Sequence, residues 1–519
     1  IPIFEVSDVK NRKNTLFWYD DSVGSMRHMT ETNYEMVDSR CMNQYGQIYY
    51  LYGREVIRWN AESGAKEKVF NLAENGLGDN LALQKLFVDE EGSFYLLDHT
   101  ESPSSLFRFT QDKLIDTASI TFENLYGLNE YISGCAAEFS RKNPNCNISF
   151  NFENDPQQME PNRTRVMADI MNGKGPDILL VRRSDMLLLQ EKDALADLSS
   201  CINGDMRDNI FPAILRAGEV DGKLVGLTES FSISTMLVRN DIWSKDSWSI
   251  DDVLKLAESE SYGSLFIFPW SKNSKSKFLF SRLVSADLEY SPFIDWNEGV
   301  CDFDNALFRE CVEVCKQYHR DDKPESNYYN MEEIEKEQMK ALKEREVLAI
   351  ETSIGSLYEF SKKMDMAGDD CHYVGFPTEG ESGNQFSFGG FLVVNKNSEH
   401  YDEIKEFLQF AFSKEKQRKM GTSTIRKDVL ESNIIYPDWT DGPEFAIGGG
   451  RYEPLASKED GTPYLEEYYA FIDSCVAEPD QMSGVSDIID EEIAQYFDVQ
   501  YDLDKVIDII ESRVQLYLD

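Results

Sequence analysis

The five histidines are the first residues to consider for catalysis, because histidine is the side chain best suited to acid–base chemistry near neutral pH. None lies in an HExxH sequence or beside a GxSxG sequence, and the chain has no P-loop, strand-borne GxGxxG or EF-hand loop. Its 94 acidic residues are so numerous that a glycosidase-like carboxylate pair could be placed anywhere, so such a pair predicts nothing. The sequence gives no support for catalysis.

Binding of a small polar ligand is better supported, because polar and aromatic side chains follow several predicted strands. In α/β proteins, ligands gather outside the carboxyl ends of strands and between lobes. We therefore expect the ligand to contact a set of residues at or beside strand ends: Glu123, Asn124, Arg182, Asp185, Ser230, Phe231, Ser232, Trp270, Glu351, Thr352, Phe388 and Gly389.

Several of these residues have an equally ordinary structural explanation. Trp270, in a Pro-Trp-Ser-Lys-Asn loop, suits the rim of a cleft and the edge of a core about equally well. Arg182 and Arg183 are solvated charges or structural partners about as often as they are ligand contacts. An arginine that reaches the cleft favours a hydroxyl-rich or anionic ligand. Gly389 and Gly390 also suit a simple strand bend.

Alternating strands and helices are predicted to position the first of these residues. A strand over 119–122 precedes an amphipathic helix that an Asn-Pro pair ends. A strand over 148–152 precedes a helix that Gly173 can stop. Residues 178–181 are continuously apolar, as in strands buried in parallel sheets. This alternation predicts an α/β fold with a doubly wound sheet.

The middle of the chain is interpreted as a second lobe. A charged helix is predicted over 331–345, and a strand over 346–351 returns towards the first lobe. Residues 386–395 are predicted to cross between the lobes, and the C-terminal part is mostly helical.

Residues 1 to about 115 are predicted to be β-rich and contain a weak repeat. Asn43-Gln-Tyr-Gly-Gln-Ile-Tyr-Tyr-Leu51 recurs 46 residues later as Asp89-Glu-Glu-Gly-Ser-Phe-Tyr-Leu-Leu97. A glycine-containing turn followed by an alternating strand is typical of a propeller blade. Two blades do not close a ring, so either further blades preceded Ile1 or the region is a small β-sheet appendage. We favour a partial propeller-like domain.

Composition narrows the class of protein. With 52 basic and 94 acidic residues the formal charge is −42, which disfavours nucleic acids and anionic membranes as partners. No run of 18 apolar residues predicts a membrane span. Of the nine scattered cysteines, Cys311 and Cys315 lie one helical turn apart without a CxxC or histidine partner, so we interpret them as core residues. No metal or organic cofactor is predicted. The start at Ile1 is consistent with removal of a signal peptide or longer segment.

Four segments carry a family resemblance: Gly175-Pro-Asp-Ile178, Asp193-Ala-Leu-Ala-Asp-Leu198, Asp221-Gly-Lys-Leu-Val-Gly-Leu227 and Arg239-Asn240. Their order and spacing resemble the pattern GPDI, G-x-L-x-DL, DGK-x-x-GLP and N-K-D of extracellular solute-binding proteins of ABC importers, the sugar-binding family 1 type. The ending R-x-x-x-Y-L is also similar, so the resemblance spans about Thr117 to Asp519.

The resemblance implies a two-lobe, type II periplasmic-binding-protein-like fold after an N-terminal domain. The implied domains are 1–115, a first lobe of 116–227 and 350–415, and a second lobe of 228–349 and 416–519. The resemblance also implies an exported binding component that captures a small polar solute, most often a carbohydrate, without catalysis. It implies delivery to membrane permease subunits, a lipoprotein anchor on the outer face of the cytoplasmic membrane, and a monomer.

Closure around the ligand is expected by hinge bending near Leu227, Ala349 and Phe391. The chain departs from the family at sites where maltodextrin-binding members stack sugars on tryptophans, since Val181 and Ile354 occupy those places. The departures leave the fold assignment intact and the identity of the solute open.

Three other functions also fit the sequence. The lobes can act as a sensor that reports ligand occupancy to a membrane signalling partner, which a neighbouring kinase gene rather than a permease gene would indicate. They can serve as the binding module of a secreted carbohydrate-active enzyme, which turnover of a glycan would support. The chain can also be an adhesion or scaffold protein, in which case residues 1–115 alone bind a partner.

Overall fold

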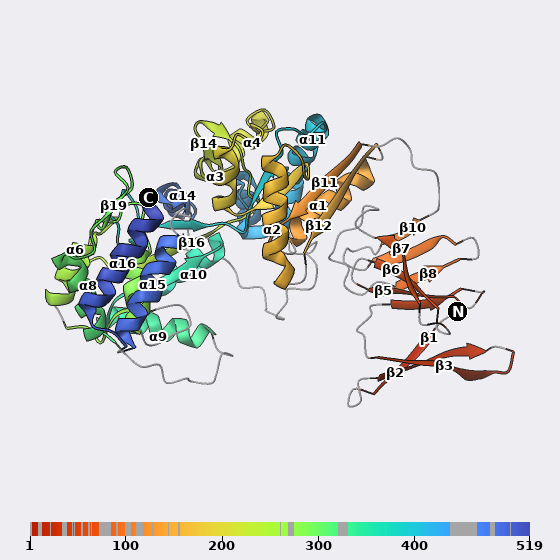
Figure 1. The fold of residues 1–519 in the computed structure, drawn as a ribbon, viewed down its shortest axis with the longest axis horizontal. Coiled ribbons are helices and arrows are strands. Elements are labelled where there is room, and N and C mark those ends of the chain that lie inside the picture. Colours follow the sequence, from red (N-terminus) through yellow and green to blue (C-terminus); the bar gives the residue numbers. More distant parts are fainter. Residues whose placement is uncertain are drawn as a thin grey trace.

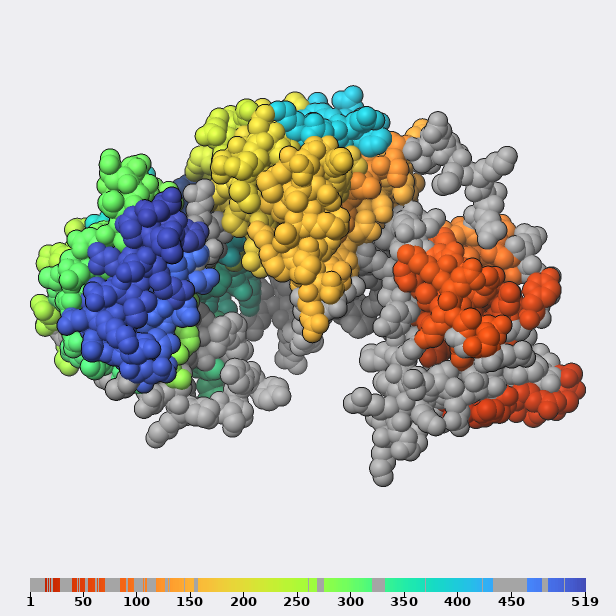
Figure 2. Space-filling model, viewed as in Figure 1, coloured from red at the N-terminus to blue at the C-terminus, as the bar shows by residue number. Residues whose placement is uncertain are grey.

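The computed structural model describes residues 3–8, 13–20, 22–33, 39–43, 45, 47–52, 55–60, 63, 65–71, 85–89, 92–98, 105–109, 118–126, 129–143, 145–153, 156–259, 261–267, 275–319, 331–368, 370–435, 464–477, 483–498 and 500–519. Small antiparallel sheets, a first α/β lobe and a second α/β lobe follow one another along the longest axis (Figure 1). In the space-filling view the first lobe lies over a hollow flanked by the other two groups (Figure 2).

The first lobe is built on a four-stranded sheet in the order β12-β11-β13-β23. Its strands are β11 (Ala118–Asn124), β12 (Cys146–Phe152), β13 (Ile178–Val181) and β23 (Phe391–Val394). The first three are parallel, and β23 joins β13 antiparallel. Along β13, Ile178 and Leu180 enter one apolar core while Leu179 and Val181 enter another. The predicted buried strand is confirmed, because both faces of the sheet are covered.

Helices cover the two faces of this sheet. Asn129 starts α1 by accepting a hydrogen bond from the backbone N of Ile132 at 2.9 Å, and Gly173, at φ +73°, follows the end of α2. The helices are α1 (Glu130–Lys142), α2 (Pro156–Met171), α3 (Arg183–Glu191), α4 (Gly204–Asn209), α5 (Pro212–Ala217), α11 (Tyr401–Ala411), α12 (Lys414–Gln417), the 3₁₀ helix η3 (Arg418–Ser423) and α13 (Lys427–Ile435), with the hairpin β14 (Glu219–Val220) and β15 (Lys223–Leu224).

The second lobe has a mixed sheet in the order β17-β20-β16-β22-β24, with β21 also paired to β16. Its strands are β16 (Ser232–Arg239), β17 (Ser264–Ile267), β20 (Val347–Ile354), β21 (Cys371–Tyr373), β22 (Gln385–Ser387) and β24 (Val476–Ala477). The strand β16 is antiparallel to β20, β21 and β22. The doubly wound parallel arrangement expected from the sequence is therefore a mixed α/β arrangement here.

The remaining elements of this lobe surround that sheet. They are α6 (Ile250–Ser259), α7 (Ser276–Phe280), the π-helix η2 (Ser281–Ser285), α8 (Ala306–Gln317), α9 (Met331–Lys343), α10 (Leu357–Ala367), α14 (Leu465–Ser474), α15 (Ser483–Phe497) and α16 (Leu503–Leu518), with the hairpin β18 (Ile294–Asp295) and β19 (Val300–Cys301). A large apolar core joins α6, α8, α15 and α16 to the sheet.

Strand pairing places the lobe boundaries differently from 350 and 416. Residues 347–354 pair within the second sheet, so the return to the first lobe comes at β23. Residues 414–435 remain with the first lobe, where Lys416 pairs with Glu138 of α1. Ala349, an expected hinge, lies inside β20. The sequence pattern identifies a strand correctly but does not say which sheet it joins.

The described residues of the N-terminal region form three antiparallel sheets. They contain β1 (Ile3–Asp8), β2 (Lys13–Asp20) and β3 (Ser25–Asn33); β4 (Ser39–Met42), β5 (Ile48–Tyr52), β6 (Glu55–Trp59) and β7 (Lys66–Asn71); and β8 (Lys85–Val88), β9 (Phe94–Asp98) and β10 (Ser105–Phe109). A shared core joins the second and third sheets and includes Leu51, Val56 and Leu96. Over the described strands the sheets do not close into a ring.

Candidate functional site

A buried ion pair lies at the carboxyl end of the first-lobe sheet. Asp185, in the first turn of α3, is 1% exposed and accepts hydrogen bonds from Arg163 of α2 and from the hydroxyl of Tyr126. Arg163 Nε lies 3.1 Å from Asp185 Oδ1 and 2.9 Å from the Tyr126 hydroxyl oxygen. Burial and the Asp185 carboxylate both raise the pKa of Tyr126. Its hydroxyl therefore stays protonated and donates to the carboxylate.

Arg182 lies on the solvent side of this arrangement. Its guanidinium carbon lies 4.3 Å from the centroid of the Tyr126 ring, and its side chain is exposed. Arg182 is the N-cap residue of α3 without a side-chain capping bond. Stacking on the ring orients the guanidinium while its N–H groups stay available to a ligand. Of the two candidates on this segment, Arg182 is presented to solvent and Asp185 is buried beneath it.

Glu123 and Asn124 end β11 in different environments. Glu123 is partly exposed and accepts a hydrogen bond from Asn162 Nδ2 at 3.0 Å. Asn124 is 2% exposed, and its side chain accepts from the backbone N of Tyr126 at 3.0 Å. In this conformation Asn124 shapes the turn that carries Tyr126, while Glu123 remains partly open to solvent.

Two chain segments cross side by side between the lobes. On the first-lobe side, Leu227 and Leu392 exchange backbone hydrogen bonds of 3.0 and 2.7 Å. On the second-lobe side, Ser232 pairs with Ser387. Residues 228–231 and 388–390 lie between these pairs and therefore form two short connections.

The aromatic candidates on these crossings belong to the core in this conformation. Phe231 is 5% exposed and packs edge-to-face on Phe211 of the first lobe and Phe386 of the second, at centroid distances of 6.5 and 5.5 Å. Phe388 is partly buried against Phe386. Ser230 is partly buried, and its carbonyl accepts from Thr228.

Gly389 is exposed, and a Cβ at this position would meet no atom within 4 Å. The crossing does not require a glycine here for steric reasons.

Glu229 on the first crossing was not among the sequence candidates. It is 4% exposed; Oε1 accepts from Asn129 Nδ2 at 2.7 Å, and Oε2 has no hydrogen-bond partner among the described residues. Its backbone carbonyl accepts from Gln417 Nε2 at 3.3 Å. Burial raises the pKa of Glu229, because it disfavours the charged form.

The second-lobe candidates lie on β20. Glu351 is 8% exposed and accepts from Arg282 Nε at 2.8 Å, while Thr352 is buried and pairs with Thr235 of β16. Arg282 belongs to η2, and π-helical turns are often found at functional sites. Trp270 lies outside the described residues.

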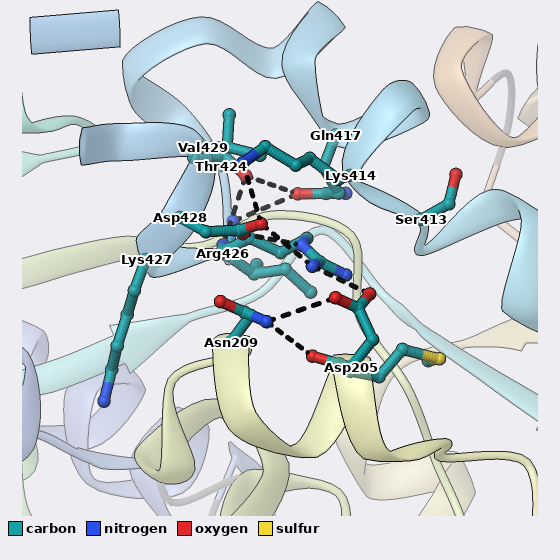
Figure 3. A network of polar contacts seen from close by, with 12 residues as sticks. Asp205, Asn209, Ser413, Lys414, Gln417, Thr424, Arg426, Lys427, Asp428 and Val429 are labelled. Atoms are coloured by element: carbon teal, nitrogen blue, oxygen red, sulfur yellow. Dashed lines mark hydrogen bonds and ion pairs between the residues drawn. The ribbon is translucent and has the colours of Figure 1, made fainter. Parts of the chain in front are cut away.

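A fully buried arginine fixes the segment after α12 to the first lobe (Figure 3). Arg426 donates at 2.9 Å to Asp205 of α4 and at 2.9 Å to Asp428 at the start of α13. Burial opposes ionisation of Asp428, but the bonds from Arg426 outweigh it and lower the pKa of that carboxyl. This network holds structure rather than presenting a site, because Arg426 is not exposed.

In the described part of the chain, no three His, Cys, Asp or Glu side chains are grouped to hold a metal ion, and no helix has the length and apolar character to cross a bilayer. All nine cysteines are unpaired, and all but Cys301 are buried.

Several functional candidates escaped the sequence reasoning. Tyr126, Arg163, Glu229 and Arg282 acquire their roles through partners distant in the sequence. Arg163 is 22 residues from Asp185 and Arg282 is 69 residues from Glu351. The sequence signal that bears on Arg163 and Arg282 is that their partners, Asp185 and Glu351, lie at or beside strand ends.

A search with family models matches residues 135–447 to the bacterial extracellular solute-binding proteins. A search of the curated proteins finds no match. Among solved structures, an extracellular solute-binding protein family 1 from Alicyclobacillus acidocaldarius is 11% identical with a TM-score of 0.47, covering 78% of this chain and 100% of its own.

Two further structures have comparable similarity. The ABC substrate-binding protein from Listeria monocytogenes, solved in complex with cycloalternan, is 15% identical, with a TM-score of 0.45 and coverage of 78% of this chain and 99% of its own. The sugar-binding protein MalE from Xanthomonas citri is 11% identical, with a TM-score of 0.46 and coverage of 77% and 97%. The family match spans more than half of the sequence and includes strands of both lobes, so the chain belongs to the family of bacterial extracellular solute-binding proteins.

Proposed function

We propose that this protein captures a small polar solute, a carbohydrate, between its lobes and delivers it to the membrane permease of an ABC importer. The observation that carries the proposal is the pair of crossings at 228–231 and 388–390. Two short adjacent connections allow the lobes to rotate about them while the strand ends on either side approach one another. No bond in the solute is made or broken.

Hydroxyl-binding groups at the strand ends support a carbohydrate. In the first lobe we assign ligand contact to Arg182 and the partly exposed Glu123, on the crossings to Ser230 and Gly389, and at the start of β16 to Ser232. The other members of the predicted set remain candidates for contact after closure: Asn124, Asp185, Phe231, Trp270, Glu351, Thr352 and Phe388.

Half-exposed aromatic rings in the second lobe also suit a sugar. Phe278 of α7 and Tyr290 are each 50% exposed and flank Arg282 in the sequence. Aromatic faces pack against the apolar side of a sugar ring, and a guanidinium donates to its hydroxyls. The combination supports carbohydrate more than peptide.

Family membership supports a proposal for where the protein acts in the cell. We propose that the protein acts outside the cytoplasmic membrane, is held there as a lipoprotein, and docks as a monomer on permease subunits. Size measurement in solution and detection of a lipidated cysteine in the native protein test these points. A stable oligomer or a cytoplasmic location contradicts them.

Thermal unfolding with a panel of solutes tests the main proposal. Monosaccharides, oligosaccharides, sugar acids, polyols and peptides are added to the purified chain. A ligand at 100 times its Kd stabilises the folded state by about 2.7 kcal/mol. Recovery of an unchanged carbohydrate after binding supports the proposal. Consumption of the sugar indicates an enzyme, and stabilisation by peptides alone contradicts the carbohydrate assignment.

The three N-terminal sheets support, as a further proposal, a partial propeller. Their first strands β1, β4 and β8 are neighbours in turn, as the inner strands of successive blades are. An experimental structure in which the sheets radiate from these strands supports this interpretation. A sandwich without a common axis contradicts it.

A further inference from the structure

We infer that the site takes an acidic carbohydrate, a sugar bearing a carboxylate, and that Arg182 binds the acid group. The inference rests on the proposed function and specifies the class of its ligand. It depends on the layered arrangement of Arg163, Asp185, Tyr126 and Arg182 at the end of the first-lobe sheet.

Arg163 and Asp185 fix the position of Tyr126, on whose ring Arg182 stacks. Asp185 receives hydrogen bonds from Arg163 and Tyr126, so its negative charge is already satisfied beneath the surface. Tyr126 is therefore held at its hydroxyl end, and its ring packs against the apolar core that contains Val181. A ring fixed in this way gives the guanidinium of Arg182 a defined platform.

The platform is then unsuited to stacking a neutral sugar. Tyr126 packs against the apolar core, and the guanidinium carbon of Arg182 lies 4.3 Å from the ring centroid, where it occupies a face on which a sugar would stack. The group offered to the ligand at this edge is a cation rather than an aromatic face.

The charge of Arg182 is not neutralised by a neighbouring carboxylate. No ion pair joins it to an acidic side chain in the described part of the chain, although acidic residues outnumber basic ones 94 to 52. The nearest acid along the chain, Asp185, is committed to Arg163. The exposed guanidinium, with its planar N–H donors, fits a carboxylate in a two-bond geometry.

Calorimetric titration of the full chain at low ionic strength tests the inference. The probes are D-galacturonate, D-glucuronate and their short oligomers, each compared with its methyl ester and with galactose or glucose. A sulfated galactose serves as a second anion. We expect the uronate to bind at least about 10-fold more tightly than its ester, since hydrogen bonds to charged groups are the stronger ones.

Arg182→Gln should weaken uronate binding about 10- to 100-fold and weaken binding of the ester by a smaller factor, because the ester carbonyl accepts a hydrogen bond but carries no charge. Arg182→Lys should recover part of the loss, because it restores the charge but not the planar donor pair. The matched control is Arg207→Gln, which removes an exposed cation from α4 of the same lobe and should have no effect. Unchanged melting temperatures exclude misfolding as the cause.

The outcomes separate this inference from the proposed function. Binding of neutral sugars with no preference for uronates overturns the inference and leaves carbohydrate capture standing. Preference for the sulfated sugar over uronates also overturns the carboxylate assignment. Uronate binding that is insensitive to Arg182→Gln removes Arg182 from the site. Binding of no carbohydrate at all overturns both proposals.

Discussion

The two lobes arrange a buried carboxylate and an arginine in different ways. In the first lobe, the buried Asp185 pairs with Arg163, and a second arginine, Arg182, is exposed and stacks on Tyr126. In the second lobe, Glu351 is paired with Arg282, whose side chain is 36% exposed. Among the described residues, Arg182 thus has no acidic partner, whereas Arg282 is already paired with Glu351. A charged ligand group should accordingly be recognised by the first lobe.

The largest effect should come from Asp185→Asn. The substitution removes the buried counter-charge of Arg163, which keeps its ion pair with the exposed Glu160, and we expect a loss of about 3 kcal/mol in the free energy of unfolding. Urea denaturation measures this loss. The matched control is Asp169→Asn, which breaks an exposed ion pair between Asp169 and Arg165 of the same helix and should leave the midpoint unchanged. Equal effects of the two substitutions would mean that the Asp185–Arg163 pair contributes no more to stability than an exposed ion pair does.

A smaller loss is expected for Glu351→Gln. Arg282 retains access to water, so its released charge can be solvated, and we expect about 1 kcal/mol. Asp251→Asn, in an exposed pair with Lys255, is the control and should not move the urea midpoint. If Glu351→Gln proved as costly as Asp185→Asn, the contrast between the lobes would fail.

The smallest change in the free energy of unfolding, at acidic pH, is expected for Glu229→Gln. Glu229 lies on the crossing 228–231 between the lobes. Among the described residues no arginine pairs with Glu229, and burial raises its pKa above the usual 4.5, so between the two pKa values the folded carboxyl keeps a proton that the unfolded chain has lost. Its contribution to stability is thus greatest below pH 4.5 and falls as pH rises through the folded value.

Glutamine should therefore match the wild type in acid and become relatively more stable as pH rises. Urea denaturation of both proteins between pH 4 and 8 measures the difference. A difference that stays constant with pH, or that favours glutamate at high pH, would show that Glu229 is not a buried neutral acid.

Much of the fold followed from local patterns in the sequence. The apolar run 178–181 is a buried strand, Asn143 ends α1, and the C-terminal helices lie where periodicity predicts them. These features depend on residues close together in the chain. The prediction that residues 350–387 belong to the first lobe was wrong. Strands β20, β21 and β22 pair with β16 of the second lobe, and no local sequence pattern specifies that pairing.

The candidate site was predictable to the same extent. Strand-end reasoning selected Arg182, Asp185 and Glu351, each of which has a polar or ring partner that helps define the site. It could not tell whether Phe231 contacts a ligand or packs on Phe211 and Phe386 in the core. Both environments favour an aromatic residue at the start of a strand. It also missed Arg163, which resembles any other helical arginine until α2 packs beside α3.

In the proposed closure, the two short crossings serve as the fulcrum about which the lobes turn. A segment of four residues spans at most about 14 Å when fully extended, so the lobes can turn about 228–231 and 388–390 but cannot draw far apart there. Displacement must then increase with distance from the fulcrum, as along a lever. A pair of spectroscopic labels at the exposed positions Lys174 and Lys255 should register closure, whereas a label at Gly389 should hardly move.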